Sequence, residues 1–193
     1  MKINGNGQAK IFTIAELDRL FDRGFLTPRD RLLFAITYYC ACRISEALAL
    51  TTDDLASGVV TFRKATTKGK SRTRTVPIHP TLAQYLKAYN PAPGLLFPGR
   101  SGLKPLTRAM ADLIFKHACK RVRIQGASTH SFRRTALTNM SNANVPLPVI
   151  QKVSGHSSLA ALQRYLEVKP DQVVAAVALL PSLPCAAIRC DGS

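Results

Sequence analysis

The sequence predicts a mainly α-helical fold with one small antiparallel β-sheet, an α+β arrangement within a single domain. Apolar residues recur at helical spacing along most of the 193 residues, as they do in amphipathic helices. One region differs, because residues 59–65 and 73–78 are rich in Val, Thr, Phe and Ile and flank the basic turn Thr67–Ser71. That pattern is typical of a β-hairpin. The length suits one domain with a buried core, which we place at residues 13–180, with a flexible lead at 1–12 and a loose tail at 181–193.

The first half of the chain contains two expected helices before the hairpin. Thr13 and Glu16 have the spacing of a capping box, which predicts a helix start at Thr13. A second helix is expected to begin near Pro28 and run to about Leu50, because its apolar residues keep helical spacing throughout. A short strand near Leu55 could join the hairpin.

Further helices are expected after the hairpin. The next spans 81–89, and another is marked on one face by Leu106, Met110, Leu113, Ile114 and His117, with Arg108, Lys116, Lys120 and Arg123 on the other face. The remaining helices are expected at 131–142, at 149–153 with a stop at Gly155, at 158–166 and at 171–180.

The charge of the chain is distributed unevenly. The net charge is +16, residues 1–60 are neutral overall, and no Asp or Glu occurs between Asp54 and Asp112. A one-sided basic charge of this kind favours a polyanionic partner, and we expect nucleic acid. The chain has no apolar run long enough to cross a membrane and no secretory leader, so we expect a cytoplasmic, nucleoid-associated protein without a membrane partner. The five cysteines lack metal-site spacing, which argues against zinc or a disulfide framework.

Six scattered residues have the side chains needed to handle a phosphodiester. Two can grip phosphate oxygens, three can move protons, and one can act as a nucleophile; they are Arg43, Lys68, His130, Arg133, His156 and Tyr165. Arg43 is expected beside the apolar stripe of its helix, with Glu46 one turn away to hold it. Taken alone, an ordinary surface Arg–Glu pair explains these two residues better.

The hairpin turn carries a dense group of cations around Lys68, namely Arg63, Lys64, Lys70, Arg72 and Arg74. Neighbouring cations lower the pKa of a lysine, which suits Lys68 to the role of general acid. Lys70 is an alternative for that role, and simple phosphate contact is an alternative for both. The same cations, with Arg108 and Arg134, are our candidate DNA-binding residues.

The remaining candidates lie in the second half of the chain. His130 and Arg133 are three residues apart at a helix start and therefore share a face, whereas Arg134 points elsewhere. His156 follows Gly155 at a tight turn, where a lone histidine is usually structural, and Tyr165 near a helix end is usually a buried aromatic. His79 and His117 are expected to be structural. Each candidate is weak alone, and their order and flanking residues carry the prediction.

These motifs together resemble the tyrosine recombinase (phage integrase) family. Residues 41–50 (ACRISEALAL) look like its first arginine motif, and residues 67–70 (TKGK) look like its hairpin lysine segment. Residues 130–135 (HSFRRT) resemble its H-x-x-R motif, and residues 153–168 resemble the segment that ends in its nucleophilic tyrosine. The match runs from about Thr13 to Lys169.

The resemblance implies a site-specific DNA recombinase that cleaves strands through a 3′-phosphotyrosyl intermediate. It implies that Tyr165 attacks the phosphate, that Arg43 and Arg133 stabilise the developing charge, and that Lys68 protonates the leaving oxygen. His130 then assists proton transfer, His156 hydrogen-bonds the phosphate and Glu46 orders the site. No metal or other cofactor is expected, because the phosphotyrosyl bond stores the energy of the cleaved bond. Implied partners are double-stranded DNA, further copies of the chain in a tetramer on DNA, and an accessory DNA-bending protein.

The chain departs from the family pattern at three places. Ala41 stands where the family often has glycine, a mild change, and Ser154 replaces a common leucine, which we expect to loosen the packing under His156. Only about a dozen residues precede the catalytic domain, so the usual N-terminal core-binding domain is expected to be absent. Either the chain is a truncated form of a longer protein, or it resembles the short single-domain members such as the fimbrial switch invertases. In the family, the segment after the tyrosine docks on a neighbouring subunit, and residues 171–180 could do so here.

Two other functions remain open from the sequence. A topoisomerase IB-like nicking and closing activity would use the same residues with little strand exchange. A non-enzymatic DNA-binding protein derived from a recombinase is a third candidate, although such a protein would be expected to lose catalytic residues. An RNA-binding module is poorly supported, because Phe62 alone offers a stacking platform on the predicted sheet.

Overall fold

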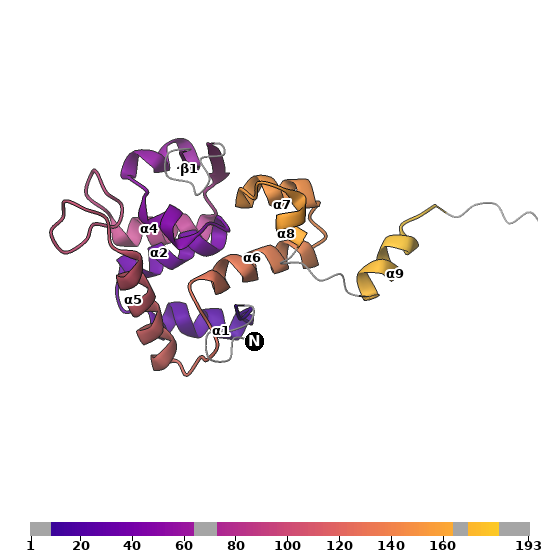
Figure 1. The fold of residues 1–193 in the computed structure, drawn as a ribbon, viewed down its shortest axis with the longest axis horizontal. Helices are drawn as coiled ribbons and strands as arrows, with labels where there is room; N and C mark the ends of the chain where they lie inside the picture. The colour runs from indigo at the N-terminus through magenta and orange to yellow at the C-terminus, as the bar shows by residue number, and fades with distance from the viewer. Residues whose placement is uncertain (1–8, 64–72, 164–169, 182–193) are drawn as a thin grey trace, which may run out of the picture.

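The predicted fold class is confirmed by a computed structural model, which describes residues 9–63, 73–163 and 170–181. Within these ranges the chain is mostly helical, with one antiparallel pair of strands, β1 (Val59–Phe62) and β2 (Arg74–Pro77) (Figure 1). The register pairs Val60 with Val76 and Phe62 with Arg74. Most of the described helices pack around a shared core. None of the described helices is long and apolar enough to cross a membrane.

The N-terminal helix begins as predicted. Thr13 accepts the backbone N–H of Glu16, and the Glu16 carboxylate accepts the backbone N–H of Thr13, which completes the capping box of α1 (Ile14–Arg19). A short π-helical turn, η1 (Leu20–Gly24), continues it, and α2 (Pro28–Tyr39) follows after a cap by Thr27.

The single long helix predicted from Pro28 to Leu50 is wrong. Helix α2 ends at Tyr39, Ala41 has a φ of 44°, and a short helix α3 (Ile44–Leu48) begins after Arg43, whose backbone is extended. The apolar spacing continues across the break because Cys40, Cys42 and Leu48 are all buried in the same core. Periodicity therefore could not reveal the turn, and Arg43 caps a helix instead of lying within one.

The region around Leu55 also differs from the prediction. It belongs to a 3₁₀ segment, η2 (Thr52–Gly58), so it is not a strand, and the sheet has two strands in the part of the chain described. The carboxylate of Asp54 accepts the backbone N–H and the hydroxyl of Thr51, which tightens this turn before β1. Helix α4 (Pro80–Tyr89) follows β2 as predicted, and His79 caps it by accepting the backbone N–H of Thr81.

The buried face of α5 (Arg108–Arg121) is not the predicted one. Ala111, Phe115, Ala118 and Cys119 are buried, whereas Met110 and Leu113 are nearly half exposed and His117 is exposed. Small side chains let η1 approach α5 closely, because Gly24 of η1 lies against Ala118 of α5. His117 is therefore not a core residue.

Four helices complete the described chain. They are α6 (His130–Asn142), α7 (Leu147–Ser154), α8 (Leu159–Gln163) and α9 (Pro170–Ala178). Gly155 ends α7 in the left-handed conformation, as predicted. Helix α9 lies apart from the other helices, as Figure 1 shows, and the predicted tail at 181–193 falls outside the described residues except for Pro181.

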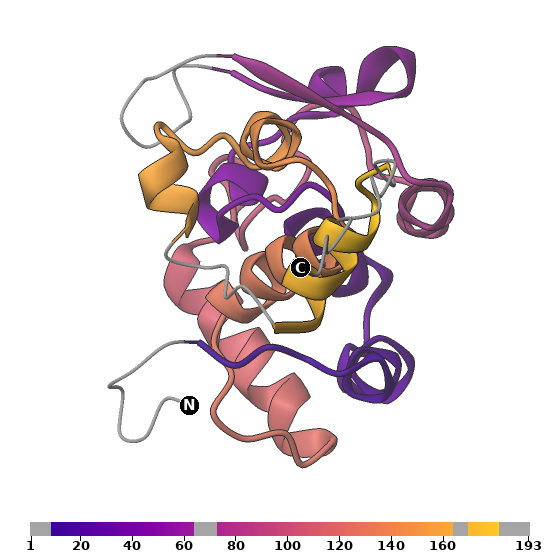
Figure 2. The same cartoon turned by 90° about the vertical axis from the view of Figure 1, so that its right-hand side faces the viewer.

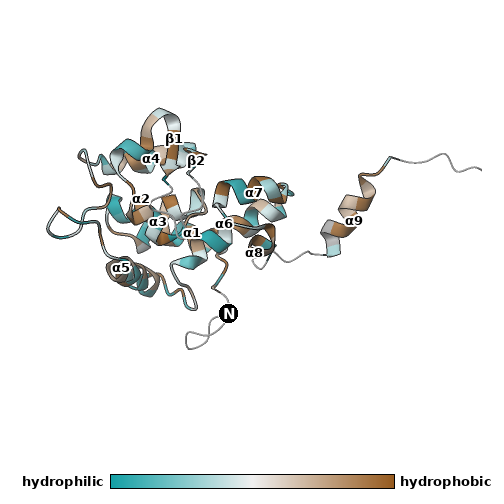
Figure 3. Cartoon of the chain, turned by 45° about the horizontal axis from the view of Figure 1, so that its top comes forward, coloured by the Kyte–Doolittle hydropathy of each residue, from teal (hydrophilic) through white to brown (hydrophobic). Residues whose placement is uncertain are grey.

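The core is built around phenylalanine rings. Phe132 of α6 contacts Phe25, Phe34 of α2 and Phe115 of α5, with ring centroids 5.4–6.3 Å apart. Figure 2 shows α6 crossing the middle of the molecule, and Figure 3 shows apolar residues on the helix faces turned inward. This packing fixes α6 against the turn between α2 and α3, which sets the position of the polar site described next.

Candidate active site

The centre of the polar site is Glu46, whose side chain is 1% exposed. It lies in the first turn of α3 and accepts the backbone N–H of Arg43 at 2.8 Å. The Arg43 guanidinium pairs with the same carboxylate, with Nη1 3.3 Å from Oε1. The helix start therefore places Arg43 at the site edge, with its side chain 30% exposed.

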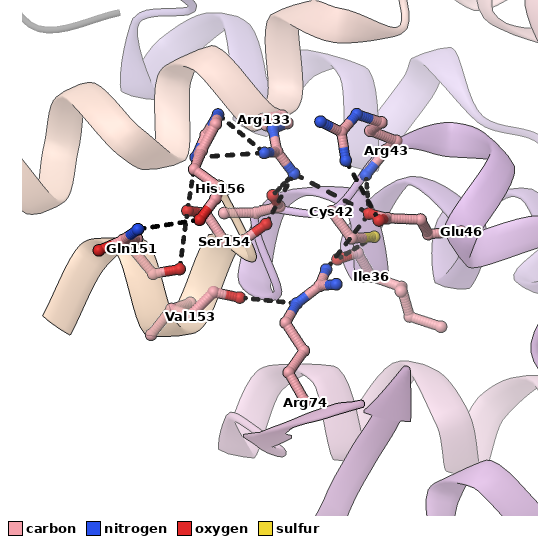
Figure 4. A network of polar contacts seen from close by, with 11 residues as sticks. Ile36, Cys42, Arg43, Glu46, Arg74, Arg133, Gln151, Val153, Ser154 and His156 are labelled. Atoms are coloured by element: carbon pink, nitrogen blue, oxygen red, sulfur yellow. Dashed lines mark hydrogen bonds and ion pairs between the residues drawn. The ribbon is translucent and has the colours of Figure 1, made fainter. Parts of the chain in front are cut away.

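Two further arginines from distant elements converge on Glu46 (Figure 4). Arg74 of β2 places Nη2 3.2 Å from Oε2, and Arg133 of α6 places Nη1 3.9 Å from the same oxygen. Their side chains are 9% and 4% exposed. One buried carboxylate thus faces three guanidinium groups.

The charges in this site do not balance. Burial alone would raise the pKa of Glu46, but Arg74, the Arg43 backbone N–H and Arg133 together hold that pKa below its usual range, so the carboxylate is ionised. Burial and the neighbouring Arg43 lower the pKa of Arg133 to about 10, which still leaves it charged at neutral pH. Three cations beside one anion leave an excess positive charge, and a partly dehydrated cluster of this kind attracts a further anion.

Arg133 also ties three segments together. Its Nη1 donates to the carbonyl oxygens of Ala41 at 2.7 Å and Ser154 at 3.0 Å. Ala41 has a φ of 44°, in the left-handed region that favours glycine, and its carbonyl accepts from Arg133 of α6. Ala41 is fully buried.

His156 lies directly beside Arg133. Nη2 of Arg133 is 2.9 Å from Nε2 of the ring, and the hydroxyl of Ser154 is 2.7 Å from Nδ1. Burial, Arg133 and Arg43 lower the pKa of His156 to about 4, so the ring is neutral at neutral pH. The expectation that Ser154 loosens the packing is wrong, because Ser154 is fully buried and hydrogen-bonded to the histidine that it supports.

Arg74 packs tightly against the turn that carries His156. Its Nε donates to the carbonyl of Val153 at 3.1 Å, and its guanidinium lies 4.1 Å above the ring of Phe62. A side chain at Gly155 would come within 2.9–3.0 Å of the Arg74 guanidinium, so this glycine is needed for space as well as for its φ of 69°. A cleft of about 680 Å³ opens here between β2 and α7.

The structure brings Arg43, Glu46, Arg133 and His156 together, as their sequence motifs suggest. His130 is the first residue of α6 and is exposed. The two remaining catalytic candidates, Lys68 and Tyr165, lie outside the described residues, as do the DNA-binding candidates Lys64, Lys70 and Arg72.

The other DNA-binding candidates have different surroundings. Arg63 pairs with Asp54 at 2.6 Å and keeps its side chain 59% exposed, and Arg108 is exposed at the start of α5. Arg134 donates to the carbonyl of Ala9, which ties the chain before α1 to α6.

Sequence reasoning missed the place of Arg74 and Ser154 in the site. A signal for Arg74 was present, because strand alternation puts it on the same face as the buried Val76. Ser154 had no such signal. In the described part of the chain, no group of three or more His, Cys, Asp or Glu side chains is placed to hold a metal ion.

Comparisons with known proteins agree with this geometry. Residues 12–172 match the phage integrase family. The tyrosine recombinase XerC of Rhodospirillum centenum is 31% identical over 154 residues, which cover 76% of this chain and 44% of that protein. The chain thus spans about half the length of the relatives that it matches.

Solved structures share the fold. The catalytic domain of bacteriophage HP1 integrase matches with a TM-score of 0.67 and 23% identity, over 90% of this chain and 96% of that domain. The XerH site-specific recombinase bound to its difH substrate matches with a TM-score of 0.66 and 20% identity, over 94% of this chain and 57% of that one. With its fold, its arginine cluster and a family match that covers most of its length, the chain belongs to the phage integrase family.

Proposed function

We propose that the chain is the catalytic domain of a site-specific DNA recombinase that cleaves and rejoins strands through a 3′-phosphotyrosyl intermediate. The observation that carries the proposal is the cluster of Arg43, Arg74 and Arg133 around the single carboxylate of Glu46. A phosphodiester supplies the anion that this cluster lacks. Membership of a family whose relatives are named tyrosine recombinases supports the same reaction.

The arginines have distinct tasks in this reaction. Arg43 and Arg133 would hold the two non-bridging oxygens of the phosphate, where negative charge grows in the transition state. Arg133 is held by the carbonyls of Ala41 and Ser154, so it needs little reorganisation when the phosphate arrives. Arg74, fixed between Glu46 and Val153, would position the carboxylate and the turn that carries His156.

The proposed covalent step exchanges one phosphoester bond for another. The phenolic oxygen of Tyr165 attacks phosphorus and loses its proton, the bond from phosphorus to the 5′-oxygen breaks, and a 3′-phosphotyrosyl bond forms. Lys68 donates the proton that the departing 5′-oxygen needs, and His130 assists proton transfer by accepting the proton that Tyr165 loses. Religation is the reverse step, with a 5′-hydroxyl from another strand as nucleophile.

We infer that double-stranded DNA is the partner. The solved XerH structure holds its difH substrate, and the net charge of +16 in this chain suits a phosphate backbone. The exposed Arg63 and Arg108, together with Lys64, Lys70 and Arg72, are the proposed backbone contacts. Arg74 and Arg134 are used within the protein, so their replacement should change folding or catalysis more than the salt dependence of DNA binding.

We further propose that the protein assembles as a tetramer on DNA through α9. This helix exposes Val173, Val174 and Val177, which are 54%, 70% and 62% exposed. Apolar side chains clustered on an exposed helix are typical of a protein–protein interaction site. Double replacement of Val173 and Val177 by glutamate should abolish assembly on DNA and leave the monomer folded, because both side chains are exposed. Intact assembly would contradict the role of α9.

Covalent trapping tests the proposed function directly. The protein is incubated in EDTA with supercoiled DNA that carries its native genomic neighbourhood, and the reaction is stopped with SDS. The expected result is a DNA-linked protein that Tyr165→Phe does not form. A control variant, Tyr89→Phe, should form it normally, because Tyr89 is partly buried and stacks on Phe97. Adduct formation by Tyr165→Phe would contradict the assignment of the nucleophile.

The same reaction separates strand exchange from simple relaxation. Recombinant products that join two sites are expected from a recombinase, whereas relaxed circles from DNA without a paired site would favour the nicking and closing activity. Salt-sensitive DNA binding without any adduct would favour a non-enzymatic binding protein.

A further inference from the structure

A row of charged side chains runs along one side of α5. Residues four apart share a side of a helix, and the row consists of Arg108, Asp112, Lys116 and Lys120. Asp112 is half-buried, whereas the other three members are exposed, so the charge that the row presents to solvent is positive. At about 1.5 Å per residue, Lys120 lies about 12 Å along the helix axis from Asp112.

The row begins beside the candidate active site. The carboxylate of Asp112 accepts the hydroxyl of Thr129 at 3.0 Å, and Thr129 directly precedes His130, the exposed first residue of α6. Arg133 lies one turn further along the same helix. The row therefore starts next to the helix turn that carries a catalytic arginine and leads away from it along α5.

The far end of the row borders a hollow of about 510 Å³, where the chain turns back from α5 toward the start of α6 (Figure 1). Three cations line this hollow, namely Lys116, Lys120 and Arg123, together with the buried apolar residues Phe115 and Ile124. Within the part of the chain that the structure describes, none of the three cations is paired with a carboxylate. Unpaired cations gathered around one hollow attract an anion.

Arg123 has a backbone conformation that arginine rarely adopts. Its φ is 55°, in the left-handed region where glycine is the usual residue directly after a helix. The N–H of Ile124 donates to the carbonyl of Cys119 at 2.9 Å, as in a Schellman motif, so the turn itself requires this conformation. Glycine would make the same turn without strain. What arginine adds is an exposed cation at the edge of the hollow, and strain kept for a side chain of this kind points to a function.

We propose that Lys116, Lys120 and Arg123 bind the phosphate backbone of double-stranded DNA next to the cleaved site. Each DNA strand has one phosphate per about 3.4 Å of the axis, so the length of the row corresponds to about three to four base pairs. Cations repeated at successive helical turns suit a polymer of phosphates better than a single small anion. Contacts of this kind fix the position of the duplex without reading its sequence. The proposal rests on DNA as the partner in the proposed function, and it does not depend on the phosphotyrosyl chemistry.

The salt dependence of DNA binding tests this assignment. Fluorescence anisotropy gives the dissociation constant of a labelled duplex from the native genomic neighbourhood at several salt concentrations. The proteins compared are the wild type and the variants Lys116→Gln, Lys120→Gln and Arg123→Gln, alone and combined. Each lost phosphate contact lowers the slope of log K against log salt by about 0.9, so the triple variant should lose about 2.7. Lys87→Gln is the control, because Lys87 is exposed on α4 outside the row, and it should keep the wild-type slope.

Arg123→Gly separates a DNA contact from a structural role. Glycine relieves the left-handed strain, so the urea unfolding midpoint of this variant should equal or exceed that of the wild type. The same variant should bind DNA more weakly, with a slope lower by about 0.9. A lower unfolding midpoint with unchanged DNA binding would show that Arg123 serves the fold and would overturn its assignment to DNA.

The outcomes separate this proposal from the proposed function. An unchanged slope in the triple variant would overturn the proposal, and a simultaneous loss of binding to poly-glutamate would assign the hollow to an acidic protein instead. If the wild type binds no DNA, this proposal and the proposed function both fail. If the wild type binds DNA and forms the covalent adduct while the triple variant keeps its slope, only this proposal fails.

Discussion

The charge cluster makes Glu46→Gln the most informative single replacement. At an effective dielectric constant of about 20, the pairs that Glu46 forms with Arg74 and Arg133, at 3.2 and 3.9 Å, correspond to about 5 and about 4 kcal/mol of Coulomb attraction. The hydration that the buried ions lose and the mutual repulsion of the arginines oppose most of this. Removing one partner of a buried ion pair costs about 3–5 kcal/mol, and we expect Glu46→Gln to lower the free energy of unfolding by that amount.

The assay is urea unfolding at pH 7, followed by far-ultraviolet circular dichroism because the chain has no tryptophan. Asp22→Asn is the control, since the Asp22 carboxylate pairs with Arg23 at 3.0 Å on the surface with both side chains mostly exposed. That replacement should leave the unfolding midpoint unchanged. A loss below about 1 kcal/mol for Glu46→Gln would refute the idea that this carboxylate neutralises the buried arginines.

Two further predictions concern His156 and Gly155. The pKa of His156 is lowered to about 4 in the folded protein from an ordinary value near 6.5, so the unfolded chain binds the proton more readily. The neutral ring therefore contributes its full share of the free energy of unfolding above pH 6.5, and this share is lost as the pH falls toward 4. Between pH 7 and pH 5 the free energy of unfolding of the wild type should fall by about 2 kcal/mol more than that of His156→Gln, as measured by urea unfolding at the two pH values. An equal fall in the two proteins would count against a buried neutral ring. Gly155→Ala should destabilise the protein by more than about 2 kcal/mol, because it adds a clash with Arg74 to the backbone strain of a positive φ. Gly102→Ala, at a φ of 74° with open space around it, should cost only about 1 kcal/mol, and similar thermal shifts for the two variants would show that the Arg74 contact is unimportant.

The sequence was most informative where a motif and its local backbone agree. Arg133 and His156 were identified from short patterns, and the structure places them in contact. Glu46 was expected to hold Arg43, and it does so at 3.3 Å. The same reasoning could not anticipate Arg74 on this carboxylate, because that contact joins a strand to a helix start 28 residues away.

The failures have physical causes as well. The break between α2 and α3 depends on the conformation of Ala41, which leaves the apolar spacing intact. The face of α5 was misjudged because large apolar residues dominate periodicity, whereas Ala111 and Ala118 are the residues small enough for close helix packing. Ser154 was judged by the leucine that it replaces, and its value as a hydrogen-bond partner of His156 emerges only from the three-dimensional position.

The most direct test of the account is to identify the residue that becomes linked to DNA. The SDS-stopped complex is digested with nuclease and trypsin, and the peptides are analysed by mass spectrometry. Cleavage after Arg164 yields a peptide that begins at Tyr165 and contains no other tyrosine. We predict that this peptide carries a nucleotide linked through its 3′-phosphate. A nucleotide on any other peptide, or a 5′-phosphate linkage, would contradict the proposed reaction.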